Sequence, residues 1–227
     1  MKKIAVLLSG CGVYDGSEIQ EAVFTLLSIS ENGASYQCFA PNIDQHHVIN
    51  HLTGEDMNEK RNALVEAARI ARGEIKDLCT YEAGDFDGLI IPGGFGVAKN
   101  LTKWAFEGPA GAINLEVKRS IIDTIKAGKP MAGLCMGPTV IAKALQGTAA
   151  IAELSVGTTT EASPYDIGAI SRGIEATGAR SVMKSIREIA IDKQHKIVSA
   201  PCYMMEGSIL DVRQNIDQAV KKLIELA

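Results

Sequence analysis

The sequence lacks the features that mark membrane proteins and nucleic-acid-binding proteins. It has no apolar run of the roughly 18–20 residues that a membrane span needs. Acidic side chains outnumber basic ones, 27 to 23, which gives a net charge of −4 and no reason to expect nucleic acid or an anionic membrane as a partner. Aromatic residues are also scarce, at 5% with a single tryptophan, but a hydrophobic content of 46% suffices for a core.

The cysteines and the N-terminal residues favour an intracellular protein over a secreted one. The five cysteines cannot all pair, and none of them forms a CxxC or another zinc-binding spacing. This usage points to a reducing compartment, and we predict the cytoplasm. The apolar residues after Lys3 resemble the start of a secretory signal, but Gly10, Gly12 and Asp15 interrupt them, so we predict a first core strand there.

Apolar stretches alternate with amphipathic patterns along most of the chain. The patterns predict strands over residues 3–9, 35–40, 87–91, 131–134, 153–158, 188–192 and 196–200, and helices over 17–30, 58–72, 113–126, 138–145, 171–177 and 206–226. Ser17 is the expected N-cap of the first helix, in a capping box with Gln20. Such alternation predicts a single α/β domain over residues 1–227, with a doubly wound, mostly parallel sheet covered by helices on both faces.

The strongest functional pattern surrounds Cys135. An apolar strand ends at this cysteine and a helix follows, and the spacing Gly133-x-Cys135-x-Gly137 is that of a nucleophile elbow with cysteine in place of serine. A sulfur at a helix N-terminus lies near the positive end of the helix dipole, which favours the thiolate. The alternative is a buried structural cysteine.

Glycine-rich turns follow three predicted strands and should meet at the carboxyl edge of the sheet. Gly10 and Gly12 follow the first strand, Gly93 and Gly94 follow a central one, and the third turn is the cysteine elbow. A backbone N–H from the Gly93–Gly94 turn, together with that of Met136, would form an oxyanion hole. The first turn lacks the third glycine of a dinucleotide fingerprint, so we predict no nucleotide cofactor.

Two glutamates, Glu18 and Glu21, lie in the first turns of the first helix. A protonated carboxyl group beside Cys135 could donate a hydrogen bond to the thiolate, and the two groups would then share one proton. Such a carboxyl group can also move a proton on and off a substrate. Alternatively, both glutamates only complement the helix dipole. The sequence does not decide between Glu18 and Glu21 as the acid–base group.

The four histidines give no convincing base or metal site. Met136 occupies the position after Cys135, and His47 and His51 have the i, i+4 spacing of a metal pair only if their segment is helical. No nearby carboxylate completes a set of ligands, so we predict no metal.

Several motifs together resemble the ElbB family, the isoprenoid-biosynthesis-associated, glyoxalase-like or sigma cross-reacting proteins. That family lies in the PfpI/DJ-one superfamily, which is related to class I glutamine amidotransferases. The resemblance rests on four segments, LSGCGVYDGSEI at 8–19, VINHLTGE at 48–55, residues 61–73 with EAARIARG, and PGGFGVAKNL at 92–101. It extends with few gaps to about residue 145 and more loosely beyond.

The resemblance implies a flavodoxin-like three-layer sandwich, with Cys135 as nucleophile, a neighbouring glutamate, and Gly94 and Met136 as backbone oxyanion donors. The implied activity is that of a glyoxalase III-type lyase that needs neither glutathione nor another cofactor. It would convert glyoxal or methylglyoxal, small reactive aldehydes, to glycolate or lactate through a cysteine hemithioacetal. Deglycation of proteins or small molecules is another interpretation of the same chemistry. Homodimers are common in the superfamily, so we expect a homodimer.

Two other functions stay open at this stage. Cys135 could be a non-catalytic redox or electrophile sensor that is oxidised to a sulfenic or sulfinic acid. An amidohydrolase or glutaminase-like activity would instead need a distant histidine to reach the sulfur. Peptidases of the superfamily carry a histidine directly after the cysteine, where this chain has Met136.

Overall fold

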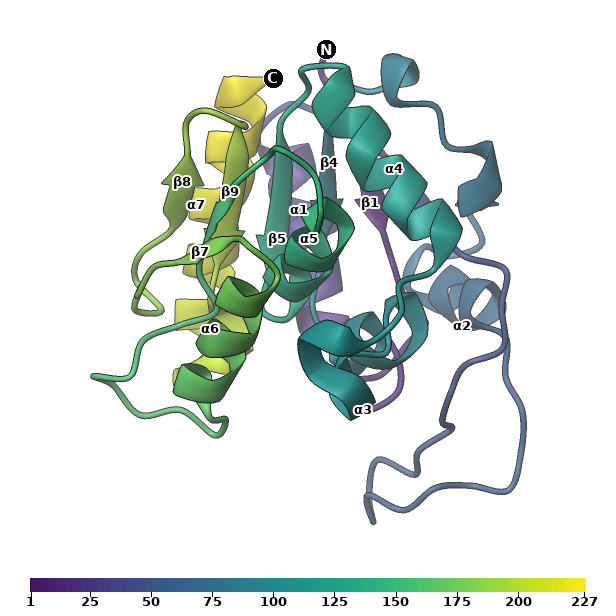
Figure 1. The fold of residues 1–227 in the computed structure, drawn as a ribbon. Coiled ribbons are helices and arrows are strands. Elements are labelled where there is room, and N and C mark those ends of the chain that lie inside the picture. Colours follow the sequence, from purple (N-terminus) through teal and green to yellow (C-terminus); the bar gives the residue numbers. More distant parts are fainter.

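A seven-stranded sheet forms the centre of the computed structural model, which describes residues 1–227 (Figure 1). The strand order is β3-β2-β1-β4-β5-β9-β8, and all neighbours pair in parallel except the edge strand β8, which is antiparallel to β9. The strands are β1 (Lys3–Leu7), β2 (Ser35–Ala40), β3 (Ile75–Asp77), β4 (Gly88–Ile91), β5 (Met131–Leu134), β8 (Ala190–Asp192) and β9 (Ile197–Ala200), and a separate pair comprises β6 (Glu153–Leu154) and β7 (Arg180–Ser181).

Helices cover both faces of this sheet. On one face α1 (Ile19–Glu31) packs against α7 (Ile209–Leu226) and contacts α2 (Ala63–Ile70), and on the other α4 (Leu115–Lys126) packs against α5 (Gly137–Leu145). Every residue of β4 and β5 is buried, as expected for central strands covered on both sides. The predicted three-layer, mostly parallel α/β fold is therefore confirmed.

Short elements gather mainly around the carboxyl edge of the sheet. They are α3 (Trp104–Glu107), α6 (Ile167–Ala176), a π-helix η3 (Val97–Leu101), and the 3₁₀ turns η1 (Leu78–Thr80), η2 (Ala83–Asp85), η4 (Gly108–Ala110) and η5 (Cys202–Met204). The sequence patterns missed β3, η3 and α3, because segments of three to five residues are too short to show a period.

The start of α1 differs from the prediction. The helix begins at Ile19 with Glu18 as its N-cap, and the Glu18 carboxylate accepts a hydrogen bond from the Glu21 N–H at 2.6 Å. The hydroxyl of Ser17 is buried and accepts the Ser9 N–H at 2.9 Å, so it holds the glycine turn after β1 instead of the helix. The predicted capping box of Ser17 with Gln20 was therefore wrong.

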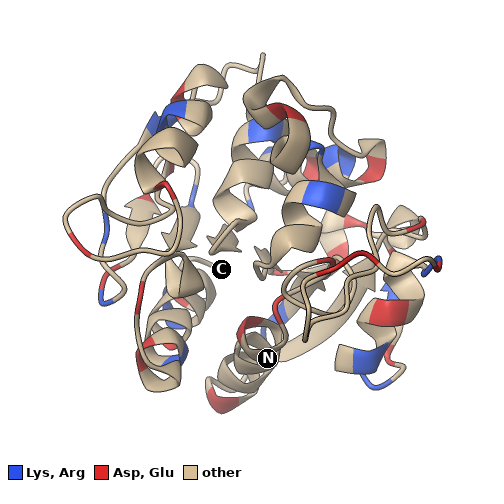
Figure 2. Ribbon diagram, turned by 90° about the horizontal axis from the view of Figure 1, so that it is seen from below, with Lys and Arg blue, Asp and Glu red and all other residues tan.

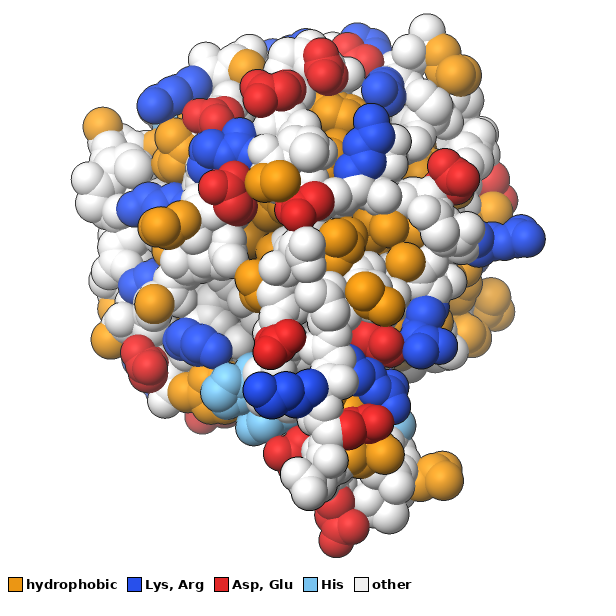
Figure 3. Space-filling view, turned by 90° about the vertical axis from the view of Figure 1, so that its right-hand side faces the viewer, with side chains coloured by type: hydrophobic (Ala, Val, Ile, Leu, Met, Phe, Trp, Pro, Cys, Tyr) orange, Lys and Arg blue, Asp and Glu red, His pale blue; other side chains and the backbone are white.

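Residues 41–62, which we call the arm, project from the carboxyl edge of the sheet (Figures 1 and 3). The helix predicted from residue 58 begins only at Ala63, because Asn62 caps it and the arm precedes it. The side-chain amide of Asn100 donates to the carbonyl oxygens of Ser9 and Asp15, at 2.9 and 2.8 Å, and its oxygen accepts the His46 N–H at 2.8 Å. Asn100 thus ties the arm to the first glycine turn.

Basic and acidic residues are mixed along the chain on all sides of the ribbon (Figure 2). None of the helices combines the length and the apolar character that crossing a bilayer would require.

Candidate active site

Cys135 stands on a sharp turn between β5 and α5. Its φ is +54°, a left-handed backbone conformation that residues other than glycine rarely adopt. The Cys135 N–H donates to the carbonyl oxygen of Ala200 at 2.9 Å. A Cβ atom at Gly137 would lie 2.7 Å from the carbonyl oxygen of Ile91, and one at Gly133 would lie 2.8 Å from the nitrogen of Pro138. Glycine is therefore required at both positions, because neighbouring backbone atoms lie too close to leave room for a side chain.

The structure brings Glu21 to the sulfur. Its carboxyl group is fully buried, and it accepts hydrogen bonds from the N–H groups of Gly93 at 3.1 Å and Tyr203 at 3.2 Å. It also forms a side-chain hydrogen bond with Cys135. Glu18 has a different position, because its carboxyl group caps α1 and lines the cavity above the cysteine. The sequence did not distinguish the two glutamates, but in the structure only Glu21 contacts the sulfur, and Glu18 lies one helical turn away.

Burial controls the protonation of the Cys135–Glu21 pair. Burial, and after it the charge of the neighbouring Glu18, raise the pKa of Glu21 to about 8, against the hydrogen bonds that lower it. Burial and the charge of Glu21 also raise the pKa of the Cys135 thiol, although the N–H groups of Gly94 and Met136 act to lower it. The helix N-terminus therefore does not by itself make Cys135 a thiolate, contrary to the sequence-based expectation. The two groups are coupled and titrate as a unit.

The stability of the protein should fall as pH rises through the range in which Glu21 titrates. The pKa of Glu21 is about 8 in the folded chain against an ordinary value of 4.5, so the folded state binds this proton more tightly. The stabilisation is complete below about pH 4.5 and is lost progressively as pH rises to about 8 and above. We expect the unfolding free energy of the wild type, measured in urea, to fall by a few kcal/mol relative to Glu21→Gln between pH 5 and pH 9. Parallel pH profiles of the two proteins would contradict this.

The glycine turn after β4 packs directly on the pair. A Cβ atom at Gly93 would overlap the Cys135 Cβ and lie 2.5 Å from Glu21 Oε2 and 2.8 Å from Cys135 Sγ. Gly94 has a φ of +99° and no room for a side chain beside Ser17 and Glu18. The N–H groups of Gly94 and Met136 both act to lower the pKa of the Cys135 thiol, which indicates that both face the sulfur.

Substituting Gly93 with alanine should disrupt the site. Its added methyl group has no space between Cys135 and Glu21, and overpacking of this kind costs about 1–3 kcal/mol. Chemical denaturation of Gly93→Ala measures this loss. Gly84→Ala is the matched control, because nothing lies within 4 Å of a Cβ atom there and its φ is not positive. Equal stability of the two variants would refute the packing argument.

Gly10 and Gly12, predicted as site turns, lie beside the arm. Their φ values are +112° and +133°, and a Cβ atom at Gly10 or Gly12 would lie 2.5 Å from Gln45 Oε1 or 2.6 Å from His51 Cε1. These two glycines therefore let the arm approach the first turn and do not contact the sulfur in the way that Gly93 does.

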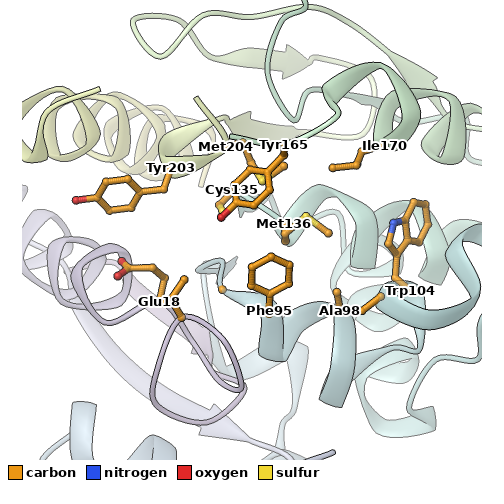
Figure 4. Close-up of a pocket in the computed structure, with 13 residues that line it drawn as sticks. Glu18, Phe95, Ala98, Trp104, Cys135, Met136, Tyr165, Ile170, Tyr203 and Met204 are labelled. Atoms are coloured by element: carbon orange, nitrogen blue, oxygen red, sulfur yellow. The ribbon is translucent and has the colours of Figure 1, made fainter. Parts of the chain in front are cut away.

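A mostly apolar cavity of about 270 Å³ opens above Cys135 (Figure 4). Figure 4 shows Glu18 and Tyr203 on one side of it and Ala98, Ile170 and Trp104 on the other. The wall includes residues that sequence reasoning did not select, namely Phe95, Trp104, Tyr165, Tyr203 and Met204. These side chains come from separate turns and short helices, and no local spacing in the sequence relates them to the elbow.

Histidines are absent from the lining of this cavity. His195 lies in the β8–β9 turn with its Nδ1 2.8 Å from Asp192, and His46 and His47 belong to the arm. His51 stacks on Tyr14 with a ring-centroid distance of 4.9 Å. No three His, Cys, Asp or Glu side chains approach closely enough to hold a metal ion.

Sequence relatives of this chain are named as mitochondrial proteins. The human glutamine amidotransferase-like class 1 domain-containing protein 3, mitochondrial, is 40% identical over 226 residues, which cover 99% of this chain and 83% of the human protein. The rat ES1 protein homolog, mitochondrial, is 39% identical over 226 residues, covering 99% and 84%. These names contradict the prediction of a cytoplasmic protein, which was wrong. Unpaired cysteines distinguish reducing from oxidising compartments, and they do not distinguish one reducing compartment from another.

Solved structures and a family model identify the family. The structure of an isoprenoid biosynthesis protein with amidotransferase-like domain from Ehrlichia chaffeensis matches with a TM-score of 0.90 at 32% identity, covering 100% of this chain and 99% of that one. Drosophila melanogaster DJ-1beta shares the fold, with a TM-score of 0.55 at 15% identity over 100% of this chain and 95% of that one. The family model Glutamine amidotransferase class-I matches residues 56–225. This chain therefore belongs to the class I glutamine amidotransferase family.

Proposed function

We propose that this protein is a glutathione-independent glyoxalase that converts glyoxal to glycolate and methylglyoxal to lactate. The observation that carries the proposal is the pairing of Cys135 with the buried carboxyl group of Glu21 beneath an apolar cavity that no histidine lines. We further propose membership of the ElbB branch. The four sequence motifs and the name of the Ehrlichia protein support it.

The first step is addition of the Cys135 sulfur to the aldehyde. A carbon–sulfur bond forms, the electrons of the carbon–oxygen double bond move to oxygen, and that oxygen takes up the proton that the thiol–carboxyl pair releases. The N–H groups of Gly94 and Met136 would stabilise the negative charge that develops on the oxygen. The product is a hemithioacetal, and the apolar wall of the cavity strengthens these hydrogen bonds by excluding water.

The second step moves a proton between the two carbons of the substrate. The Glu21 carboxylate takes the proton from the sulfur-bearing carbon, which gives an enediolate, and then returns it to the neighbouring carbon. In the same step the hydroxyl group on the sulfur-bearing carbon gives its proton to the neighbouring oxygen, so that the sulfur-bearing carbon becomes a thioester carbonyl. Water cleaves the thioester to the acid and regenerates the thiol, so no net oxidant or reductant is needed. A pKa of about 8 suits Glu21 to this role, because general acid–base catalysis works best near the operating pH.

The test is an assay without glutathione in which both the loss of aldehyde and the formation of glycolate or lactate are quantified. The proposal requires many molecules of acid per protein molecule. Consumption of one aldehyde per thiol without acid would refute it, since any reactive thiol can form an adduct.

A redox or electrophile sensor is the second candidate, and the same hydrogen bond supports it. A protonated Glu21 could donate to the oxygen of an oxidised Cys135, which is 6% exposed at the base of the cavity. Mass spectrometry after mild peroxide treatment should then show oxidation at Cys135 ahead of the exposed Cys79. The amidohydrolase alternative loses support, since no histidine lines the cavity to act as its base.

A further inference from the structure

A second cavity continues outward from the one above Cys135. It has a volume of about 690 Å³ and shares three lining residues, Phe95, Ala105 and Tyr165, with the inner cavity. Its remaining lining comes from the first glycine turn, the arm, η3 and α3, at Tyr14, His47, Ile49, Gly54, Lys99 and Phe106. We call this cavity the outer groove. Cavities of several hundred Å³ hold ligands much larger than a two- or three-carbon aldehyde.

Lys99 is the only Lys, Arg, Asp or Glu that lines the outer groove. Its ammonium group donates to the carbonyl oxygen of Tyr14 at 2.8 Å and lies 5.6 Å from the centre of the Phe95 ring. A lysine has three N–H donors, so this contact leaves two for a ligand. Lys99 is half-buried, which lowers the pKa of its ammonium group, while the carboxylates of Asp15 and Asp56 act to raise it. An anion at this position would interact with it more strongly than at a fully exposed lysine.

The π-helix η3 contributes side chains to the walls of both cavities. Ala98 lines the inner cavity, Lys99 lines the outer groove, and Asn100 holds both the first glycine turn and the arm. Turns of this kind are rare and occur frequently at functional sites. One five-residue turn therefore shapes the walls of both cavities.

The two cavities carry side chains of opposite charge at their two ends. Glu18 is the only Lys, Arg, Asp or Glu that lines the inner cavity, and the single charged side chain of the outer groove is Lys99. Aromatic rings lie between these ends, with Phe95 and Tyr165 in edge contact at a centroid distance of 5.8 Å. A flat molecule with an anionic end would be repelled at Glu18 and attracted at Lys99, and its other end would then face Cys135.

We infer that the outer groove is a second substrate subsite, in which Lys99 binds a carboxylate or phosphate carried by an aldehyde whose reactive end lies at Cys135. The inference rests on the proposed function for the identity of the reactive end. The anion-binding role of Lys99 is independent of turnover and is tested without it.

The experiment measures binding of three stable aryl ketones that cannot undergo the glyoxalase reaction. Acetophenone is neutral, and 4-acetylbenzoate and 4-acetylphenyl phosphate carry an anion opposite the ketone. Ligand-observed NMR titrations should give dissociation constants at least about tenfold lower for an anionic ketone than for acetophenone, because a hydrogen bond to a charged group is stronger than one between neutral groups. The ranking of benzoate and phosphate identifies which anion the groove prefers.

Variants separate binding by Lys99 from support of the Tyr14 loop. In Lys99→Met the ratio of the dissociation constant of acetophenone to that of an anionic ketone should fall to about one. Lys99→Arg should retain most of the wild-type ratio. Lys126→Met is the control and should keep the full preference, because Lys126 is exposed at the end of α4 and does not line the outer groove. Equal affinity of the wild type for all three ketones would overturn the inference. An equal loss of neutral and anionic binding in Lys99→Met would overturn it too. None of the three ketones is a substrate, so these binding measurements test the role of Lys99 even if the protein has no glyoxalase activity.

Discussion

Cys135→Ala is expected to abolish the formation of glycolate and lactate, with a fall in turnover on the order of 10⁴-fold or more. The proposed chemistry proceeds through a bond to this sulfur, and no other cysteine lines the cavity. Gly94 and Met136 would keep their N–H groups in the variant, but they stabilise charge only after the sulfur has added to the aldehyde. The measurement is quantification of acid product over many enzyme equivalents.

Cys79→Ala is the control for non-specific thiol chemistry. Cys79 is exposed on η1 and does not line the cavity, so its removal should lower any stoichiometric adduct formation without changing turnover. Acid production that survives in Cys135→Ala would exclude the covalent mechanism. Loss of turnover in both variants would point instead to a general dependence on thiols.

Glu21→Gln should lower kcat by about 10²–10⁴-fold, the range typical for loss of a general acid–base group. The amide oxygen can still accept the N–H groups of Gly93 and Tyr203, so the fold around the site is retained. An amide cannot take up and return a proton, which removes the enediol step. The measurement is kcat and KM for methylglyoxal in both glutamate variants.

Glu18→Gln is the matched variant one helical turn away. Its amide oxygen can still cap α1, and we expect less than about a tenfold effect on kcat because Glu18 acts only at the edge of the cavity. A larger loss in Glu18→Gln than in Glu21→Gln would reverse the assignment. Equal large losses would mean that the two carboxyl groups, which are coupled electrostatically, act together.

The sequence predicted most of the fold because its information is local and periodic. Buried strands such as 87–91 and 131–134 stand out as apolar runs, and the long C-terminal helix stands out by its 3.6-residue pattern. The predictions failed where long-range contacts decide. Ser17 is a good helix cap in isolation, yet the structure uses its hydroxyl to hold Ser9 and gives the cap to Glu18.

In the candidate site, too, local features could be predicted from the sequence and long-range contacts could not. The spacing around Cys135 by itself determined a strained strand-to-helix turn, since only glycine fits the backbone approaches at Gly133 and Gly137. Only the tertiary structure decided that Glu21 meets the sulfur. Glu18 and Glu21 are one turn apart, and their difference depends on how α1 packs against α7 and β2. The protonation of the pair was likewise decided by burial, because desolvation is a property of the assembled core and outweighs the helix dipole that the sequence reveals.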